Sequence, residues 1–64
     1  MDKKILLEYK KYINEKKKKE LELSKLYYNR KLNKEEKIIN NIVLNDDITR
    51  IEKKLIILGK ELSN

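Results

Sequence analysis

The 64-residue sequence contains no cysteine, histidine, proline, tryptophan or phenylalanine, and it contains a single glycine. Without cysteine and histidine, disulfide bridges and the commonest zinc ligands are excluded. With one glycine and no proline, a fold built from many tight turns is not expected. A chain this short usually needs a disulfide, a metal or a second chain for stability. We therefore expect it to associate with a protein partner, in the first place with itself as a homo-oligomer.

Long apolar runs are also missing. The longest is the four-residue segment "LIIL" at Leu55–Leu58, which is far too short to cross a bilayer. With no signal-peptide pattern at the start, we expect a cytoplasmic protein. The segment "KKILLEYKKYI" is basic and amphipathic, as membrane-surface helices are, but its apolar face has a partner later in the chain. A membrane partner is therefore not expected.

Charge and aliphatic side chains dominate what is present. Charged residues make up 44% of the chain, and Ile, Leu and Val occupy twenty positions. This composition is typical of long helices and coiled coils. The net charge is +6, with eleven basic and five acidic side chains in residues 1–31 and six of each in residues 32–64. The positive charge is therefore concentrated in the first half.

Two long helices are predicted. Apolar residues recur on one helical face across the first half, which predicts a helix over about residues 2–31. Asn33, followed three residues later by Glu36, is typical of a capping box. These two residues predict a turn at about 32–33 and a second helix over about 34–62.

The second helix carries a heptad seam, with apolar residues spaced by 4, 3, 4, 3 and 4. Ile38, Ile39, Ile42 and Val43 lie on a different helical face. The change of phase at 45–47 indicates a kink, a new helix that would make three in all, or one straight helix with two neighbours. The seam consists of Leu44, Ile48, Ile51, Leu55, Leu58 and Leu62.

The expected fold class is all-α: an antiparallel, coiled-coil-like two-helix hairpin in which residue i lies near residue 65 − i. Such a hairpin has too little interior for every apolar side chain, so we expect two copies to form a four-helix bundle. The seam either forms the core within the hairpin or carries the association, by contacting a second subunit or a target helix. It would be supported by Ile38, Ile42, Tyr9 and Tyr27.

Enzymatic chemistry has little support. The few Ser, Thr and Tyr hydroxyls have no general base at a recognisable spacing. Asp46 and Asp47 diverge by about 100° on a helix and make a poor chelating pair. We expect no catalytic residue, no cofactor and no metal.

Four consecutive lysines, Lys16–Lys19, point around most of a helix. Lys16 and Glu20 fall on or near the apolar face, and the predicted pairing places Asp46 and Asp47 opposite them. We interpret this arrangement as a polar register device that penalises slipped pairing. The lysines left for an acidic partner or for phosphate groups are Lys17, Lys18 and Lys19, with Lys10 and Lys11.

Two functions compete. The first is a small protein-interaction module, a regulator, adaptor or inhibitor of the kind that phages and mobile elements encode. The alternative is a basic RNA- or DNA-binding dimer that uses the lysines of the first helix. Acidic residues interrupt those lysines throughout ("EYKKY", "NEKKKKELE"), which favours the first.

Overall fold

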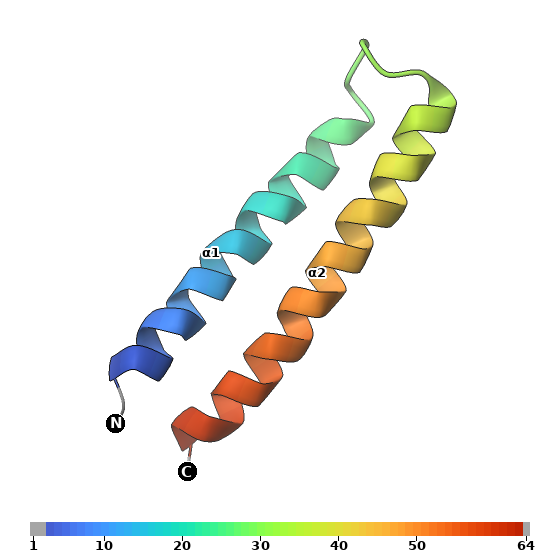
Figure 1. Ribbon diagram of the computed structural model, residues 1–64. Coiled ribbons are helices and arrows are strands. Elements are labelled where there is room, and N and C mark those ends of the chain that lie inside the picture. The colour runs from blue at the N-terminus through green and yellow to red at the C-terminus, as the bar shows by residue number, and fades with distance from the viewer. Residues whose placement is uncertain (1–2, 64) are drawn as a thin grey trace.

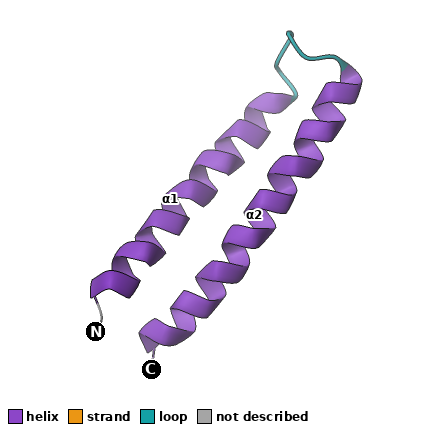
Figure 2. Cartoon of the chain, viewed as in Figure 1, coloured by secondary structure: helices purple, strands orange, loops and turns teal. Residues whose placement is uncertain are grey.

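The computed structural model describes residues 3–63 as two antiparallel helices joined by one connection (Figure 1). Helix α1 spans Lys3–Leu26 and helix α2 spans Lys34–Ser63. The start of α1 and the end of α2 lie at one end of the hairpin, and the connection forms the other (Figure 2). The Cα atoms extend over 47 × 14 × 12 Å. The prediction of an all-α hairpin of two packed helices is confirmed.

Helix α1 ends five residues before the predicted position 31, while the predicted start at residue 2 lies outside the described residues. Leu26 closes the helix and is 6% exposed. The backbone N–H groups of Tyr28 and Asn29 then bond to the carbonyls of Lys25 and Leu26, both at 3.2 Å. The Asn29 Oδ1 accepts the N–H of Lys31 at 3.0 Å. Such side-chain-to-backbone bonds compete with helix propagation, which accounts for the longer connection over 27–33.

Helix α2 begins with the predicted capping box. The N–H of Glu36 donates to Asn33 Oδ1 at 2.8 Å, and the N–H of Asn33 donates to Glu36 Oε1 at 3.5 Å. Two N–H groups that the helix itself cannot satisfy are thereby paired.

Helix α2 then continues without a break through 45–47, so the three-helix alternative is wrong. The polar residues of this stretch bond within the helix. Thr49 Oγ1 donates to the carbonyl of Asn45 at 2.9 Å, and Asp46 pairs with Arg50 at 3.0 Å. A local change of hydrophobic phase is therefore accommodated within one continuous helix that has two apolar faces.

The seam of α2 forms the core with α1. Ile48, Ile51 and Leu58 are each 8% exposed, and Leu44, Leu55 and Leu62 are half-buried. No side chain in residues 3–63 is less than 2% exposed, so the core is one thin layer.

The pairing between the helices is close to the predicted one. Lys54 bonds to Tyr12 across the hairpin and Lys19 pairs with Asp47. Both pairs are one residue away from the predicted register.

Candidate protein-interaction surface

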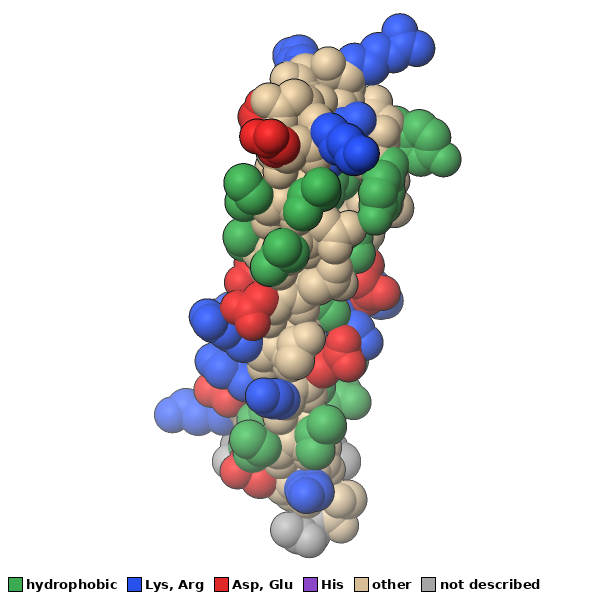
Figure 3. Space-filling view, turned by 90° about the vertical axis from the view of Figure 1, so that its right-hand side faces the viewer, with side chains coloured by type: hydrophobic (Ala, Val, Ile, Leu, Met, Phe, Trp, Pro, Cys, Tyr) green, Lys and Arg blue, Asp and Glu red, His purple; other side chains and the backbone are tan. Residues whose placement is uncertain are grey.

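The side of α2 that points away from α1, here called the outer face of α2, is rich in exposed aliphatic side chains. Figure 3 views the molecule from this side. Hydrophobic side chains gather toward the connection, charged ones occupy the middle, and a smaller hydrophobic group lies toward the chain ends. The exposed aliphatic residues of α2, each between 51% and 64% exposed, are Ile38, Ile39, Ile42, Val43, Ile56 and Ile57.

These residues share one helical face. At 100° per residue, Ile38 and Ile56 point in the same direction, as do Ile39 and Ile57. That direction is roughly opposite to the buried seam. We call Ile38, Ile39, Ile42 and Val43 the connection-end group, and Ile56 and Ile57 the terminal-end group. The 14 residues from Ile42 to Ile56 place the two groups about 21 Å apart.

The connection-end group is extended by Tyr27. Its hydroxyl accepts a hydrogen bond from Asn41 Nδ2 at 2.8 Å, and its carbonyl accepts one from Lys37 Nζ at 3.1 Å. The tyrosine is thereby fastened to α2 although it is 64% exposed. With Ile38 and Ile42 it lines a shallow apolar groove of about 360 Å³. Three of the supporting association residues are brought together on one surface.

The seam residues, predicted to form either the core of the hairpin or a contact with a partner, lie elsewhere. The whole seam from Leu44 to Leu62 faces α1 and forms the interior of the hairpin itself. Tyr9 is half-buried, and its ring comes within 3.9 Å of the position that a Cβ on Gly59 would take. The physical reason is that the strongest apolar stripe of α2 is satisfied first, inside the chain. Of the predicted set, Tyr27, Ile38 and Ile42 remain open to a partner.

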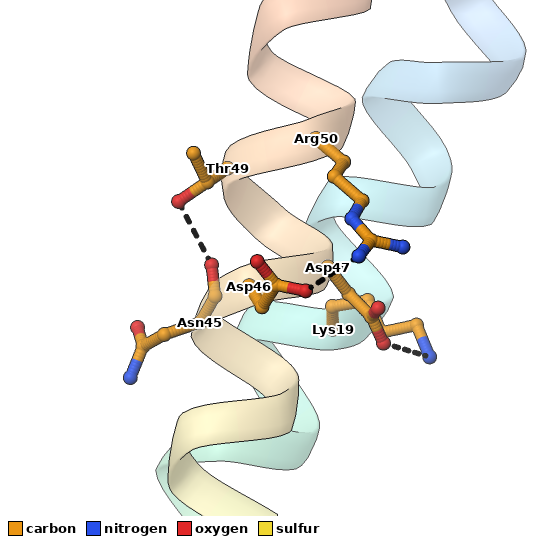
Figure 4. Close-up of polar contacts among 6 residues, drawn as sticks. All are labelled: Lys19, Asn45, Asp46, Asp47, Thr49 and Arg50. Atoms are coloured by element: carbon orange, nitrogen blue, oxygen red, sulfur yellow. Dashed lines mark hydrogen bonds and ion pairs between the residues drawn. The ribbon is translucent and has the colours of Figure 1, made fainter.

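Charges occupy the middle of the hairpin (Figure 4). Lys19 Nζ lies 3.5 Å from Asp47 Oδ2, which joins the two helices. Asp46 instead turns along its own helix and lies 3.0 Å from Arg50. The expectation that both aspartates face the lysines is therefore wrong for Asp46, because adjacent residues of a helix point about 100° apart.

The other two register residues are placed differently. Lys16 is half-buried on the inner side of α1, and Glu20 is exposed. Within residues 3–63, the lysine that reaches Asp47 is Lys19, one turn beyond Lys16.

The lysines of α1 split into inner and outer sets. Lys17 and Lys18 are exposed, together with Lys10 and Lys11, whereas Lys19 is half-buried against Asp47. The exposed lysines form two columns with seven-residue spacing, or about 10.5 Å along the helix. In the sequence this pattern is hidden by the run Lys16–Lys19, although the recurring "KK" pairs carry the signal. One column is Lys3, Lys10 and Lys17, and the other is Lys4, Lys11, Lys18 and Lys25.

Several polar side chains bond to the hairpin itself. The hydroxyls of Ser24 and Ser63 donate to the carbonyls of Leu21 and Lys60. Lys54 Nζ donates to the hydroxyl of Tyr12 at 3.2 Å and lies 5.0 Å from the centre of its ring. These contacts hold the side chains against the helices.

Neither a metal site nor a transmembrane span is found in the described part of the chain. Residues 3–63 contain no cluster of three or more acidic side chains that would hold a metal ion. In the same range, neither helix has a stretch long and apolar enough to cross a bilayer.

Comparisons of this chain with protein-family models, with curated proteins and with solved structures find no match.

Proposed function

We propose that this chain is a small, non-enzymatic protein-interaction module of the cytoplasm, a regulator, adaptor or inhibitor that acts as an associated pair of helical hairpins. The observation that supports it is the second apolar face of α2, opposite the seam. In a chain that worked alone as a hairpin, that face would be polar.

The balance of burial supports association. Among residues 3–63, four hydrophobic side chains are buried, whereas ten large ones, from Leu7 to Ile57, are more than half exposed. A single thin core of this size supplies only a few kcal/mol. Covering one half-exposed isoleucine contributes on the order of 1 kcal/mol. Contact with another protein surface would therefore add a large fraction of the total stability.

The test uses an outer-face variant and a matched control. The variant carries Ile42→Glu and Ile56→Glu on α2, and the control carries Leu7→Glu and Leu21→Glu on α1, where both leucines are also exposed. The parent and the control should associate with themselves, or retain a protein partner from a nuclease-treated extract, and the outer-face variant should do neither. A monomeric parent that retains nothing beyond what the variant retains would refute the proposal.

The lysine columns of α1 favour a second candidate, a basic dimer that binds RNA or DNA. Several lysines on the exposed side of one helix can contact the phosphates of a nucleic-acid backbone. Acidic residues flank the columns, however: Glu8, Glu15 and Glu22 also recur every seven residues. For that reason we place nucleic-acid binding second.

A further inference from the structure

The charges along the outer face of α2 are separated by sign. The charged residues nearest the centre line of this face are Glu35 and Asp46 in its first half, and Lys53 and Lys60 in its second half. All four are exposed. The two apolar groups lie between these charges, one in each half of the helix. From the start of α2 to its end, this face is therefore acidic, apolar and acidic in its first half, and basic, apolar and basic in its second half.

We propose that the outer face of α2 is the docking site for a second copy of this chain, with the two α2 helices antiparallel. This inference rests on the proposed function and names its partner. The two-fold axis passes close to residues 47–48. An isologous contact of this kind brings the first half of one face against the second half of the other.

The side chains match in that arrangement. Counting from the axis, Ile38 lies beside the partner's Ile56, and Ile39 lies beside the partner's Ile57. Each of these pairs lies on the same side of the centre line, since its members share a direction on the helix. The connection-end group of one copy thus covers the terminal-end group of the other. Each copy contributes both groups, so the contact is made twice.

Three of the four charges meet an opposite charge in the same register. Lys53 does not, because it is as far from the axis as Ile42 and lies opposite the partner's Ile42. Glu35 lies opposite the partner's Lys60, and Asp46 lies beside the partner's Arg50. Asp46 already pairs with Arg50 of its own helix at 3.0 Å, so the dimer joins two such pairs into one network at the axis. Networks of charges contribute more than isolated surface pairs.

A parallel arrangement of the same faces is disfavoured. It would align Asp46 with the partner's Asp46 and Lys53 with the partner's Lys53, and like charges in register repel. The separation of sign along the face is what selects the antiparallel orientation.

The shape of the dimer follows from α2 having opposite apolar faces. Each α2 lies between its own α1 and the partner's α2, which gives a row of four helices. Neighbours at right angles, as in a square bundle, would need the two apolar stripes of α2 to lie about 90° apart. The lysine columns of the two α1 helices then lie along the two outer edges of the row.

Disulfide cross-linking of the full chain tests the proposal, because the sequence contains no cysteine. The variants are Ile39→Cys and Ile57→Cys, each prepared separately, with Asn14→Cys on the exposed side of α1 as control. Sedimentation equilibrium of the parent accompanies them. We expect a dimeric parent and a disulfide-linked dimer when Ile39→Cys and Ile57→Cys are mixed, because these positions face each other within bonding range. Neither variant alone, nor Asn14→Cys, should cross-link.

The other outcomes overturn the proposal in distinguishable ways. Cross-linking of Ile39→Cys with itself would show a parallel contact. A dimer without a link in the mixture would place the interface elsewhere. A monomeric parent would exclude a second copy as the occupant. The proposed function would survive that last result if the parent still retained a protein that Ile42→Glu with Ile56→Glu loses.

Discussion

Lys19 Nζ lies 3.5 Å from Asp47 Oδ2, and the two side chains are each 35% exposed. Lys19 belongs to the lysine run of α1, and Asp47 to the stretch where the hydrophobic phase of α2 changes. The polar interruption of one helix therefore meets the polar interruption of the other. Shifting either helix by a turn would place one of these charges against apolar side chains, which costs free energy.

A double-mutant cycle on this pair should show a small but real coupling. We expect Lys19→Gln and Asp47→Asn to couple by about 0.5 kcal/mol in urea unfolding, since partly exposed ion pairs contribute 0–1 kcal/mol. The coupling should fall in about 1 M salt. Lys18→Gln with Asp47→Asn is the matched control, because Lys18 is exposed and should show no coupling. Equal coupling for both lysines would contradict the specific pairing.

Ile51 and Ile57 should separate folding from association. Ile51 is 8% exposed in the seam, whereas Ile57 is 58% exposed on the outer face. Ile51→Asp buries an unpaired carboxylate at a cost of several kcal/mol, comparable to the whole stability of such a chain. We expect it to abolish the helical circular dichroism signal.

Ile57→Asp, the matched change on the outer face, should keep the helical signal but sediment as a monomer. Circular dichroism and sedimentation of the two variants are compared side by side. A helical Ile51→Asp variant would refute the assignment of the seam to the core.

The capping box at the start of α2 should be worth about 1 kcal/mol. Asn33→Ala removes the acceptor of the Glu36 N–H, a bond of 2.8 Å, and loss of such caps costs about 0.5–2 kcal/mol. The midpoint of urea unfolding should fall with an unchanged slope. Asn33→Asp keeps an oxygen acceptor at the same position and should retain most of the stability. An unchanged midpoint for Asn33→Ala would show that this end of α2 is held by other contacts.

Patterns confined to one helix could be predicted from the sequence. The Asn33–Glu36 cap and the heptad seam depend on spacing alone, and both appear in the structure. The antiparallel pairing followed from two helices and a short connection. Lys19 and Asp47 lie one residue from the predicted register, whereas Tyr9 meets Gly59 three residues from it.

Features that depend on competition between contacts could not be predicted. The apolar periodicity of the first helix continues through Tyr27, so the pattern of apolar residues gave no reason for α1 to end at Leu26. The Asn29 turn is a local alternative that outcompetes the helix. Likewise, the positions of the apolar residues around α2 indicated two apolar stripes, but they did not determine which stripe would face α1. The outward position of Ile56 and Ile57 went unnoticed, although both share the directions of Ile38 and Ile39.

The lysine columns of α1 give the nucleic-acid candidate its own test. If phosphates bind there, affinity for mixed RNA or DNA should be measurable at about 50 mM salt and should fall steeply as salt rises. Lys10→Gln with Lys17→Gln should then lower both the affinity and the salt dependence. Arg30→Gln with Lys31→Gln removes the same charge from the exposed connection and should have a smaller effect. Absence of binding by the parent at low salt would exclude this candidate.

Gly59 offers a stabilising substitution that also measures how closely the helices pack. It lies inside α2 with an ordinary helical backbone, since the described glycine has no positive φ. A Cβ there would meet Tyr9 Cε2 at 3.9 Å, an ordinary van der Waals distance. Gly59→Ala should therefore raise stability by about 1 kcal/mol through helix propensity, or Tm by about 4–8 °C for a chain of this size.

Gly59→Val, in contrast, should gain less or lose stability, because its branched side chain crowds the Tyr9 ring and is a weaker helix former. Thermal unfolding of the two variants followed by circular dichroism gives the comparison. If Gly59→Ala were no more stable than the parent, the added Cβ would have to lie closer to Tyr9 Cε2 than 3.9 Å. A Tm that is higher for alanine than for glycine, and lower for valine than for alanine, would therefore report the space between the helices next to Gly59.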